Sequence, residues 1–171
     1  IQDQGGGAVM TGATAEIELA LRSLAASYAA GVDRRQLDVF LSAFHPDASL
    51  VVYGARAGVD RPPNRMQGHD EIGRVVDMIA RYPKTFHLLG QSRYEIGVDG
   101  DDRASGEVYC SAHHYIAAED GDKNHVMYIR YEDEYRRDEN SGWRIALRSV
   151  RVDWTETRLL TAATMPQGSR P

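Results

Sequence analysis

Cysteine is nearly absent from this 171-residue sequence, in which Cys110 is the only one. A single cysteine excludes an intrachain disulfide and a cysteine-rich metal site, and it agrees with a reducing compartment. No apolar run approaches the ~20 residues that a membrane-spanning helix needs. No charged start followed by an apolar core resembles a signal peptide either, so we expect a cytoplasmic protein with no membrane partner.

The sequence also lacks a concentrated patch of positive charge. Its 20 lysines and arginines are scattered among 25 acids, and the formal net charge is -5. Proteins that bind nucleic acids gather basic residues to neutralise phosphates, so we expect no nucleic-acid partner. Hydrophobic residues make up 42% of the chain, as in ordinary globular proteins, and this length fits one domain.

Helical periodicity dominates the first half of the chain. Apolar residues recur at steps of three and four after Thr14, which predicts a helix that is capped by Thr14 and loosened at Gly31, with Asp33 just past its end. A shorter helix is predicted over Arg35–Phe44, followed by a strand over HPDASLVVYG. A third helix is predicted to begin near His69.

The pattern changes to period two from Lys84 onward, after a proline-constrained segment, 55–67, that is predicted to be a surface loop. The turn sequences VDGDD, EDGDK and DENSG separate four long strands, which predicts an antiparallel meander. Helices followed by strands indicate an α+β fold, with helices on one face of a curved sheet. We assign 14–156 to this domain, 1–13 to a flexible leader and 157–171 to a C-terminal tail.

Two adjacent histidines stand in the predicted strand EVYCSAHHYI. Because successive side chains on a strand point to opposite faces, His113 falls on a polar and aromatic face and His114 on a mostly apolar face. We expect His113 to enter a cavity, and His114 to be exposed or at an interface. The histidines lack the short spacing and third ligand typical of zinc sites, so we expect no metal, and nothing requires a cofactor.

Asp33 and His87 carry little weight singly. Taken alone, His87 in KTFHLLG fits a hydrogen-bonded structural histidine, and Asp33 in GVDRRQ fits a solvated or capping acid. Arg148 and Arg151 both lie in the last predicted strand, where a bulge could reverse the alternation. The sequence therefore leaves open which arginine points inward.

With Asp33, His87 and the terminal GWRIALRSVRVDW considered together, the chain resembles the SnoaL-like family of the nuclear transport factor 2-like superfamily. That group includes scytalone dehydratase, bile acid 7α-dehydratase and hexachlorocyclohexane dehydrochlorinase. The resemblance spans 15–156 and is carried by YAAGVDRRQLD, FHLLG and YEDEYRRDENSGWRI. It implies a cone-shaped α+β fold, in which about three N-terminal helices cover the concave face of a curved, mixed and mainly antiparallel sheet.

The resemblance also implies roles for particular residues. Asp33 and His87 match the family's catalytic Asp–His dyad, and Tyr28 matches a position where the bile acid enzyme has tyrosine and the dehydrochlorinase lysine. Arg148 matches the arginine that those two enzymes place over the leaving group. His113 looks like the second histidine of scytalone dehydratase, which lacks that arginine, so this sequence combines two versions of the pocket.

The implied function is a cofactor-independent lyase, a dehydratase or similar eliminating enzyme, acting on a small hydrophobic cyclic molecule such as a steroid, polyketide or terpenoid. Phe86, Met127 and Tyr131, together with His113, are predicted to contact this substrate. An isomerase or cyclase with the same pocket, and a non-catalytic ligand-binding or dimerisation module, stay open as alternatives. We also expect a homodimer or homotrimer, because an apolar outer face of the late strands needs cover. This outer face is predicted to consist of Val108, Cys110, Ala112 and Ile116.

Overall fold

Three helices and six strands make up the part of the chain that the computed structural model describes, which is residues 12–54, 62–97 and 102–161. The helices are α1 (Gly12–Arg34), α2 (Leu37–Ser42) and α3 (Gly68–Ile79). The strands are β1 (Phe44–Tyr53), β2 (Asn64–Gln67), β3 (Lys84–Ile96), β4 (Arg103–Ile116), β5 (Lys123–Asp138) and β6 (Gly142–Leu159).

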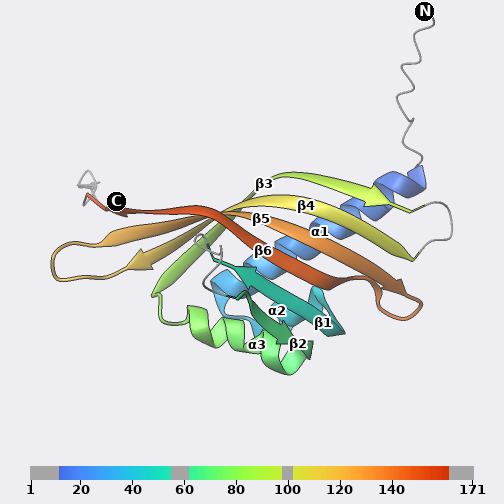
Figure 1. The fold of residues 1–171 in the computed structure, drawn as a ribbon, viewed down its shortest axis with the longest axis horizontal. Coiled ribbons are helices and arrows are strands. Elements are labelled where there is room, and N and C mark those ends of the chain that lie inside the picture. Colours follow the sequence, from blue (N-terminus) through green and yellow to red (C-terminus); the bar gives the residue numbers. More distant parts are fainter. Residues whose placement is uncertain (1–11, 55–61, 98–101, 162–171) are drawn as a thin grey trace, which may run out of the picture.

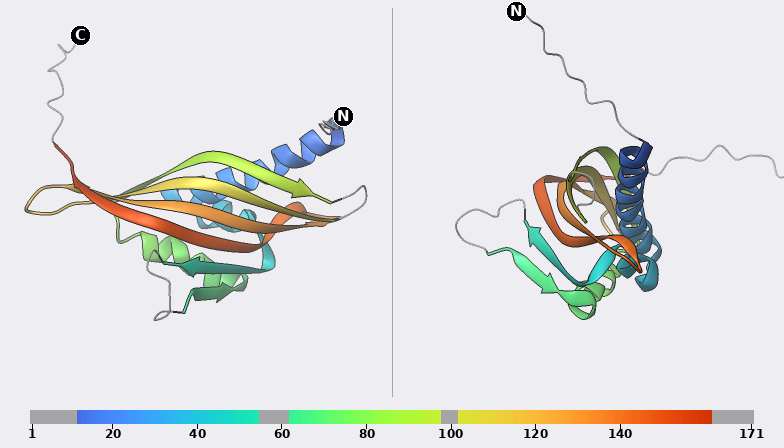
Figure 2. Two further views of the ribbon diagram at one scale, coloured as in Figure 1. Left: turned by 45° about the horizontal axis from the view of Figure 1, so that its top comes forward. Right: turned by 90° about the vertical axis from the view of Figure 1, so that its right-hand side faces the viewer.

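The six strands form one curved sheet in the order β2-β1-β6-β5-β4-β3. All neighbours are antiparallel except β1 and β6, which run parallel, so β3 to β6 form the predicted meander. Helix α1 lies along the concave side of the sheet, and α3 lies beside β1 and β2 (Figure 1). The end-on view shows the sheet curling around the helices (Figure 2). The predicted α+β class, with a mixed and mainly antiparallel curved sheet, is confirmed.

Helix α1 differs from the prediction at both ends. It begins before Thr14, which therefore lies inside the helix instead of capping it, and it continues through Asp33 to Arg34. Gly31 lies inside the helix, where it contacts α2. A Cβ atom on Gly31 would lie 2.4 Å from the backbone nitrogen of Phe40 in α2, so α2 can approach α1 only at a glycine.

Other boundaries also differ. Helix α2 is shorter than predicted, because the chain at Phe44 already pairs with β6. The C-terminal part of the predicted loop forms strand β2, which pairs with β1 from Asn64 to Gln67. Strand β6 runs three residues beyond the predicted domain boundary at 156 because its end pairs with the start of β5. Residues 1–11 of the predicted leader, 55–61 of the loop, 98–101 and 162–171 of the tail lie outside the described residues.

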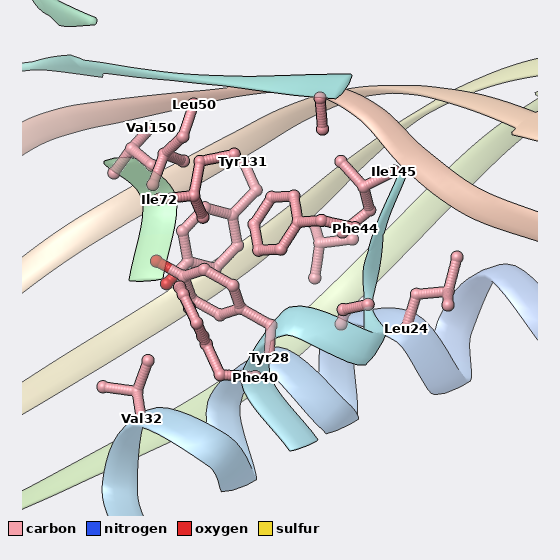
Figure 3. Packing of buried hydrophobic residues seen from close by; sticks show 14 of the residues in the cluster. Leu24, Tyr28, Val32, Phe40, Phe44, Leu50, Ile72, Tyr131, Ile145 and Val150 are labelled. Atoms are coloured by element: carbon pink, nitrogen blue, oxygen red, sulfur yellow. The ribbon is translucent and has the colours of Figure 1, made fainter. Parts of the chain in front are cut away.

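The core fills the space between the helices and the concave face of the sheet (Figure 3). Tyr28 is at its centre, with its ring 5.1 Å from Phe40, 5.9 Å from Phe44 and 5.4 Å from Tyr131 between centroids. Tilted and edge-on aromatic pairs of this kind each add about 0.5–1.5 kcal/mol beyond the burial of their area. Packing around Tyr28 therefore links α1 and α2 to β1 and β5.

The face of β4 that contains Val108, Cys110 and Ala112 is buried in this core. The prediction that these residues form an uncovered outer face is wrong. Alternation separates the two faces of a strand correctly, but it carries no information on which face the helices cover. The apolar face is the concave one, because burying it removes more apolar surface from water.

Replacing Gly31 by alanine should destabilise the protein, because the added methyl group meets backbone atoms of Phe40 that cannot rotate away. We expect a loss of about 2 kcal/mol or more in the free energy of unfolding, measured with urea. Gly12→Ala is the matched control, since a Cβ atom there meets nothing within 4 Å. Equal stability of the two variants would show that α1 and α2 can separate freely.

Candidate active site

Asp33 and His87 meet where the last turn of α1 packs against the start of β3. The His87 ring nitrogen Nδ1 lies 2.7 Å from Asp33 Oδ1, and the His87 backbone N–H donates to Asp33 Oδ2 at 2.8 Å. The hydroxyl group of Thr85 donates to Asp33 Oδ1 at 2.9 Å. The structure thus brings the predicted acid and histidine together, with Nδ1 held by the carboxylate and Nε2 left for a ligand.

These hydrogen bonds keep Asp33 ionised. Partial burial favours the neutral acid, but hydrogen bonds from His87 and Thr85 outweigh burial and lower the pKa of Asp33. An ionised carboxylate beside Nδ1 stabilises a proton on the imidazole, as a general base requires. The side chain of His87 is 6% exposed and that of Asp33 19%, so the histidine is the more enclosed member of the pair.

His87 lines a cavity of about 470 Å³ on the concave face of the sheet, a volume within the usual range of small-molecule pockets. Its polar side chains are Tyr28, Asn64, Arg81, His87, His114 and Tyr131. The rest of the wall is apolar and comes from α3 and five strands, through Leu50, Val52, Met66, Val75, Met78, Ile79, Ala112, Met127, Ile129, Val150 and Val152. Met127 and Tyr131 line this cavity, and their contact with a substrate stays a prediction.

The second histidine of this cavity is His114. Its ring centroid lies 6.1 Å from that of His87, and its Nδ1–H donates to the backbone carbonyl of His125 at 3.2 Å. Burial lowers the pKa of His114 to about 4, so the ring is neutral at physiological pH. With its hydrogen on Nδ1, His114 has Nε2 available as a hydrogen-bond acceptor.

His113 and Phe86 lie on the opposite, convex face of the sheet, so the prediction that they line the cavity is wrong. Phe86 is 60% exposed, and its ring centroid lies 6.3 Å from that of His113. His113 contacts the Ser111 hydroxyl at 3.0 Å and the side-chain amide of Asn124 at 2.9 Å. The signal that could have placed His114 inside is the set of small apolar residues on its own face of β4, Val108, Cys110 and Ala112. Such residues usually mark the buried face of a strand.

Two tyrosine side chains, Tyr28 and Tyr131, line the same cavity. Burial raises the pKa of Tyr28 to about 12 and raises the pKa of Tyr131 well above its ordinary value, so both phenols stay protonated. In Figure 3 the oxygen atoms of the two side chains lie beside each other. Both side chains belong to the wall that also contains His87.

Arg148 points inward and Arg151 outward, which resolves the question that the sequence left open. Arg148 is fully buried, and its Nε and Nη2 atoms donate to Asp133 at 2.8 and 2.7 Å. Its guanidinium carbon lies 4.3 Å from the ring centroids of both Tyr28 and Tyr131. Arg148 is thus behind the tyrosine rings and is not part of the cavity wall, which differs from the expected position over a leaving group.

Within residues 12–54, 62–97 and 102–161, no three His, Cys, Asp or Glu side chains are grouped closely enough to hold a metal ion. None of the helices in these ranges combines the length and apolar character needed to cross a membrane.

The fold and the site together define a cystatin-like α+β protein with an acid–histidine pair whose histidine lines a mainly apolar pocket. The family model described as a SnoaL-like domain matches residues 13–149, and the chain belongs to this SnoaL-like family. The family was correctly inferred from the sequence. No curated protein sequence matches the chain.

Solved structures share the fold at low sequence identity. The hexachlorocyclohexane dehydrochlorinase LinA-type3 from Novosphingobium barchaimii LL02 is 18% identical with a TM-score of 0.70, over 89% of this chain and 97% of that one. A candidate scytalone dehydratase from Novosphingobium aromaticivorans is 18% identical with a TM-score of 0.69, over 95% and 100%. A cystatin-like protein of unknown function from Nostoc punctiforme is 18% identical with a TM-score of 0.63, over 84% and 94%.

The low pKa of His114 predicts an acid-sensitive fold. Between pH 6.5, the usual value for an exposed histidine, and about pH 4, the unfolded chain binds a proton at His114 that the folded chain does not. The free energy of unfolding should therefore fall as the pH drops through this window. Urea titrations at pH 7 and 4.5 measure how far the free energy of unfolding falls between these two pH values. This fall should be smaller for His114→Asn than for the parent protein. His113→Gln, on the convex face, should lose as much as the parent, and identical losses for all three proteins would contradict the assignment.

Proposed function

We propose that the protein is a cofactor-independent lyase that removes a proton and a leaving group from a hydrophobic cyclic substrate. The observation that carries this proposal is the Asp33–His87 contact, in which His87 Nδ1 lies 2.7 Å from Asp33 Oδ1 while the His87 side chain lines a mainly apolar pocket of about 470 Å³. A charged acid fixes one imidazole nitrogen and leaves the other for a substrate, which is the arrangement of a general base.

In the proposed reaction, His87 Nε2 takes a proton from a carbon atom of the substrate. The electron pair of the broken C–H bond forms the new C=C bond, and the leaving group departs with the pair of its own bond. A departing hydroxide takes the proton from the imidazolium and leaves as water. Ionised Asp33 stabilises the imidazolium, and base catalysis of this kind is worth about 10²–10⁴-fold.

The remaining polar groups recognise the substrate. The hydroxyl groups of Tyr28 and Tyr131 donate hydrogen bonds to an oxygen that gains negative charge, and an apolar surrounding strengthens such bonds. Neutral His114 accepts a hydrogen bond from a substrate hydroxyl group. Arg148 makes cation–π contacts with the rings of Tyr28 and Tyr131. Because these rings lie between the guanidinium group and the pocket, Arg148 does not contact the leaving group.

The lining of the pocket favours a neutral, hydroxylated ring compound, such as a steroid, polyketide or terpenoid, as the substrate. Among the described residues that line the pocket, Arg81 is the one with a permanent charge, and most of the others are apolar. Two of the solved structures with this fold are a hexachlorocyclohexane dehydrochlorinase and a candidate scytalone dehydratase. The names of these two proteins describe eliminations, which agrees with a lyase.

Isomerisation is the second candidate function, and the position of Arg148 favours it. A cation behind the tyrosine rings provides no direct contact for a leaving group, whereas two phenol donors beside a base can stabilise an enolate. In an isomerase, His87 would return its proton to a different carbon of the substrate. The mass of the product separates the two reactions, because elimination lowers it and isomerisation does not.

A panel of steroids, polyketides and terpenoids, screened for a rise in melting temperature and then for turnover, supplies the substrate for the decisive test. His87→Gln should lower kcat by about 10²–10⁴-fold because the base is lost. Asp33→Asn should also lower kcat strongly, and the double variant should lose little more than His87→Gln because the two residues act as one unit. His113→Gln is the control and should keep full activity.

Two results would contradict the proposed function. If only highly charged compounds raise the melting temperature, the substrate class is wrong. If His87→Gln binds and converts a compound at the parent's rate, the pair is only a structural contact, as in a non-catalytic binding module.

We also propose self-association through the convex face of β3 to β6, as a homodimer or homotrimer. This face displays Leu88, Tyr109 and Trp154, which are 56%, 38% and 56% exposed, and no helix of the described chain covers it (Figure 2). Contiguous exposed apolar side chains of this kind mark interaction surfaces.

Sedimentation at micromolar concentration should give two or three times the 19.0 kDa of one chain. Trp154→Arg should shift the protein towards the single chain, because a charge cannot be buried there without a partner. Leu19→Arg, on a 67% exposed residue of α1, is the control and should not change the mass. A single 19.0 kDa species for the parent would exclude this interface.

A further inference from the structure

Arg35 occupies a backbone position that usually belongs to glycine. Its φ angle is 57°, in the left-handed region. The N–H of Gln36 donates to the carbonyl of Gly31 at 2.9 Å and the N–H of Arg35 to that of Val32 at 3.3 Å, which is the hydrogen-bond pattern of a Schellman motif. A side chain in this conformation costs free energy that glycine would avoid, so some contact of the Arg35 side chain has to offset it.

The guanidinium group of Arg35 makes that contact with three separate segments. Nη1 donates to the Val32 carbonyl at the end of α1 and to the Thr85 hydroxyl of β3, the latter at 2.9 Å. Nη2 donates to the carbonyl groups of Ile79 at 3.3 Å and Tyr82 at 3.0 Å, at the end of α3 and just beyond it. One side chain therefore joins α1, α3 and β3 next to the Asp33–His87 pair.

Thr85 connects this cation to the carboxylate of Asp33. Its Oγ1 accepts the hydrogen bond from Arg35 and donates its single hydrogen to Asp33 Oδ1 at 2.9 Å. Accepting a charge-assisted bond leaves the hydroxyl hydrogen directed at the carboxylate and makes it a stronger donor. The same Oδ1 atom contacts Nδ1 of His87, so the orientation of the base depends on the Thr85 bond.

We propose that Arg35 is a positioning residue that acts through Thr85 to hold the Asp33 carboxylate in line with His87 Nδ1. The inference rests on the proposed function for its effect on turnover, but its structural part does not. Arg35 itself contacts neither the cavity nor the ring of His87, so its removal should disturb the orientation of the pair and leave substrate binding intact.

The variant Arg35→Gly tests this directly, because glycine accepts the left-handed backbone and the fold should persist. With a substrate identified, kcat should fall by about 10–100-fold, the cost of a small misplacement of a catalytic group, while KM stays unchanged. Arg35→Lys keeps the charge and should recover part of the loss. Arg34→Gln, which removes the neighbouring positive charge at the same helix end, is the control and should match the parent.

A double-mutant cycle with Thr85→Val separates action through Thr85 from other effects. Valine keeps the shape of threonine and removes the hydroxyl group, so Thr85→Val should lower kcat at least as far as Arg35→Gly. Adding Arg35→Gly to Thr85→Val should then cause no further loss. Fully additive losses would overturn the proposal, because Arg35 would be acting by another route.

A measurement without substrate keeps this inference distinct from the proposed function. In proteins with ¹⁵N-labelled histidine, the His87 Nδ1–H signal should be sharp in the parent and in Arg34→Gln. It should be broadened or lost in Arg35→Gly and Thr85→Val, whose melting curves must still show a folded protein. Loss of the signal supports the positioning role even if no compound is turned over, and an unchanged sharp signal in folded Arg35→Gly overturns it.

Discussion

The structure depends on burying the Arg148–Asp133 ion pair beneath the aromatic core. Both side chains are fully excluded from solvent. Removing a charged group from water costs on the order of several kcal/mol per ion. Two short hydrogen bonds offset part of this cost, and the rings of Tyr28 and Tyr131 cover the guanidinium. Within the described chain, Arg148 Nη1 has no hydrogen-bond partner, which makes the aromatic cover a requirement for burial.

This arrangement determines how the pocket is built. The ring of Tyr28, from α1, and the ring of Tyr131, from β5, lie between the ion pair and the cavity, so the cavity receives neutral phenol groups instead of a cation. Burial keeps these phenols protonated and keeps His114 neutral. Ionised Asp33 accepts hydrogen bonds from the Thr85 hydroxyl and from the His87 backbone N–H, and Thr85 links it in turn to the guanidinium group of Arg35. The site thus separates the charge that supports the base from the neutral groups that contact a ligand.

Helix α1 positions both halves of this arrangement. Tyr28 reaches the core from its middle, and Asp33 reaches β3 from its last turn, five residues further along. The close approach of α2 at Gly31 and the hydrogen bonds of Arg35 hold that last turn in place. Stability of the fold and geometry of the proposed base therefore rely on the same short segment, from Tyr28 to Arg35.

Periodicity and turn chemistry by themselves determined the α+β class, the order of the three helices and the five longer strands, and the division of each long strand into two faces. A family resemblance added the pairing of Asp33 with His87. Alternation alone did not say which face of β4 turns inward, and the apolar run that marks the buried face was interpreted as an outer surface. His113 was misplaced for that reason. Phe86 directly precedes His87 on β3, so alternation already places the two side chains on opposite faces. The capping role of Arg35 escaped notice because glycine usually marks such a position. Only the tertiary structure decided these points, since residues 54 positions apart in the chain, such as Asp33 and His87, come into contact only when the sheet closes on α1.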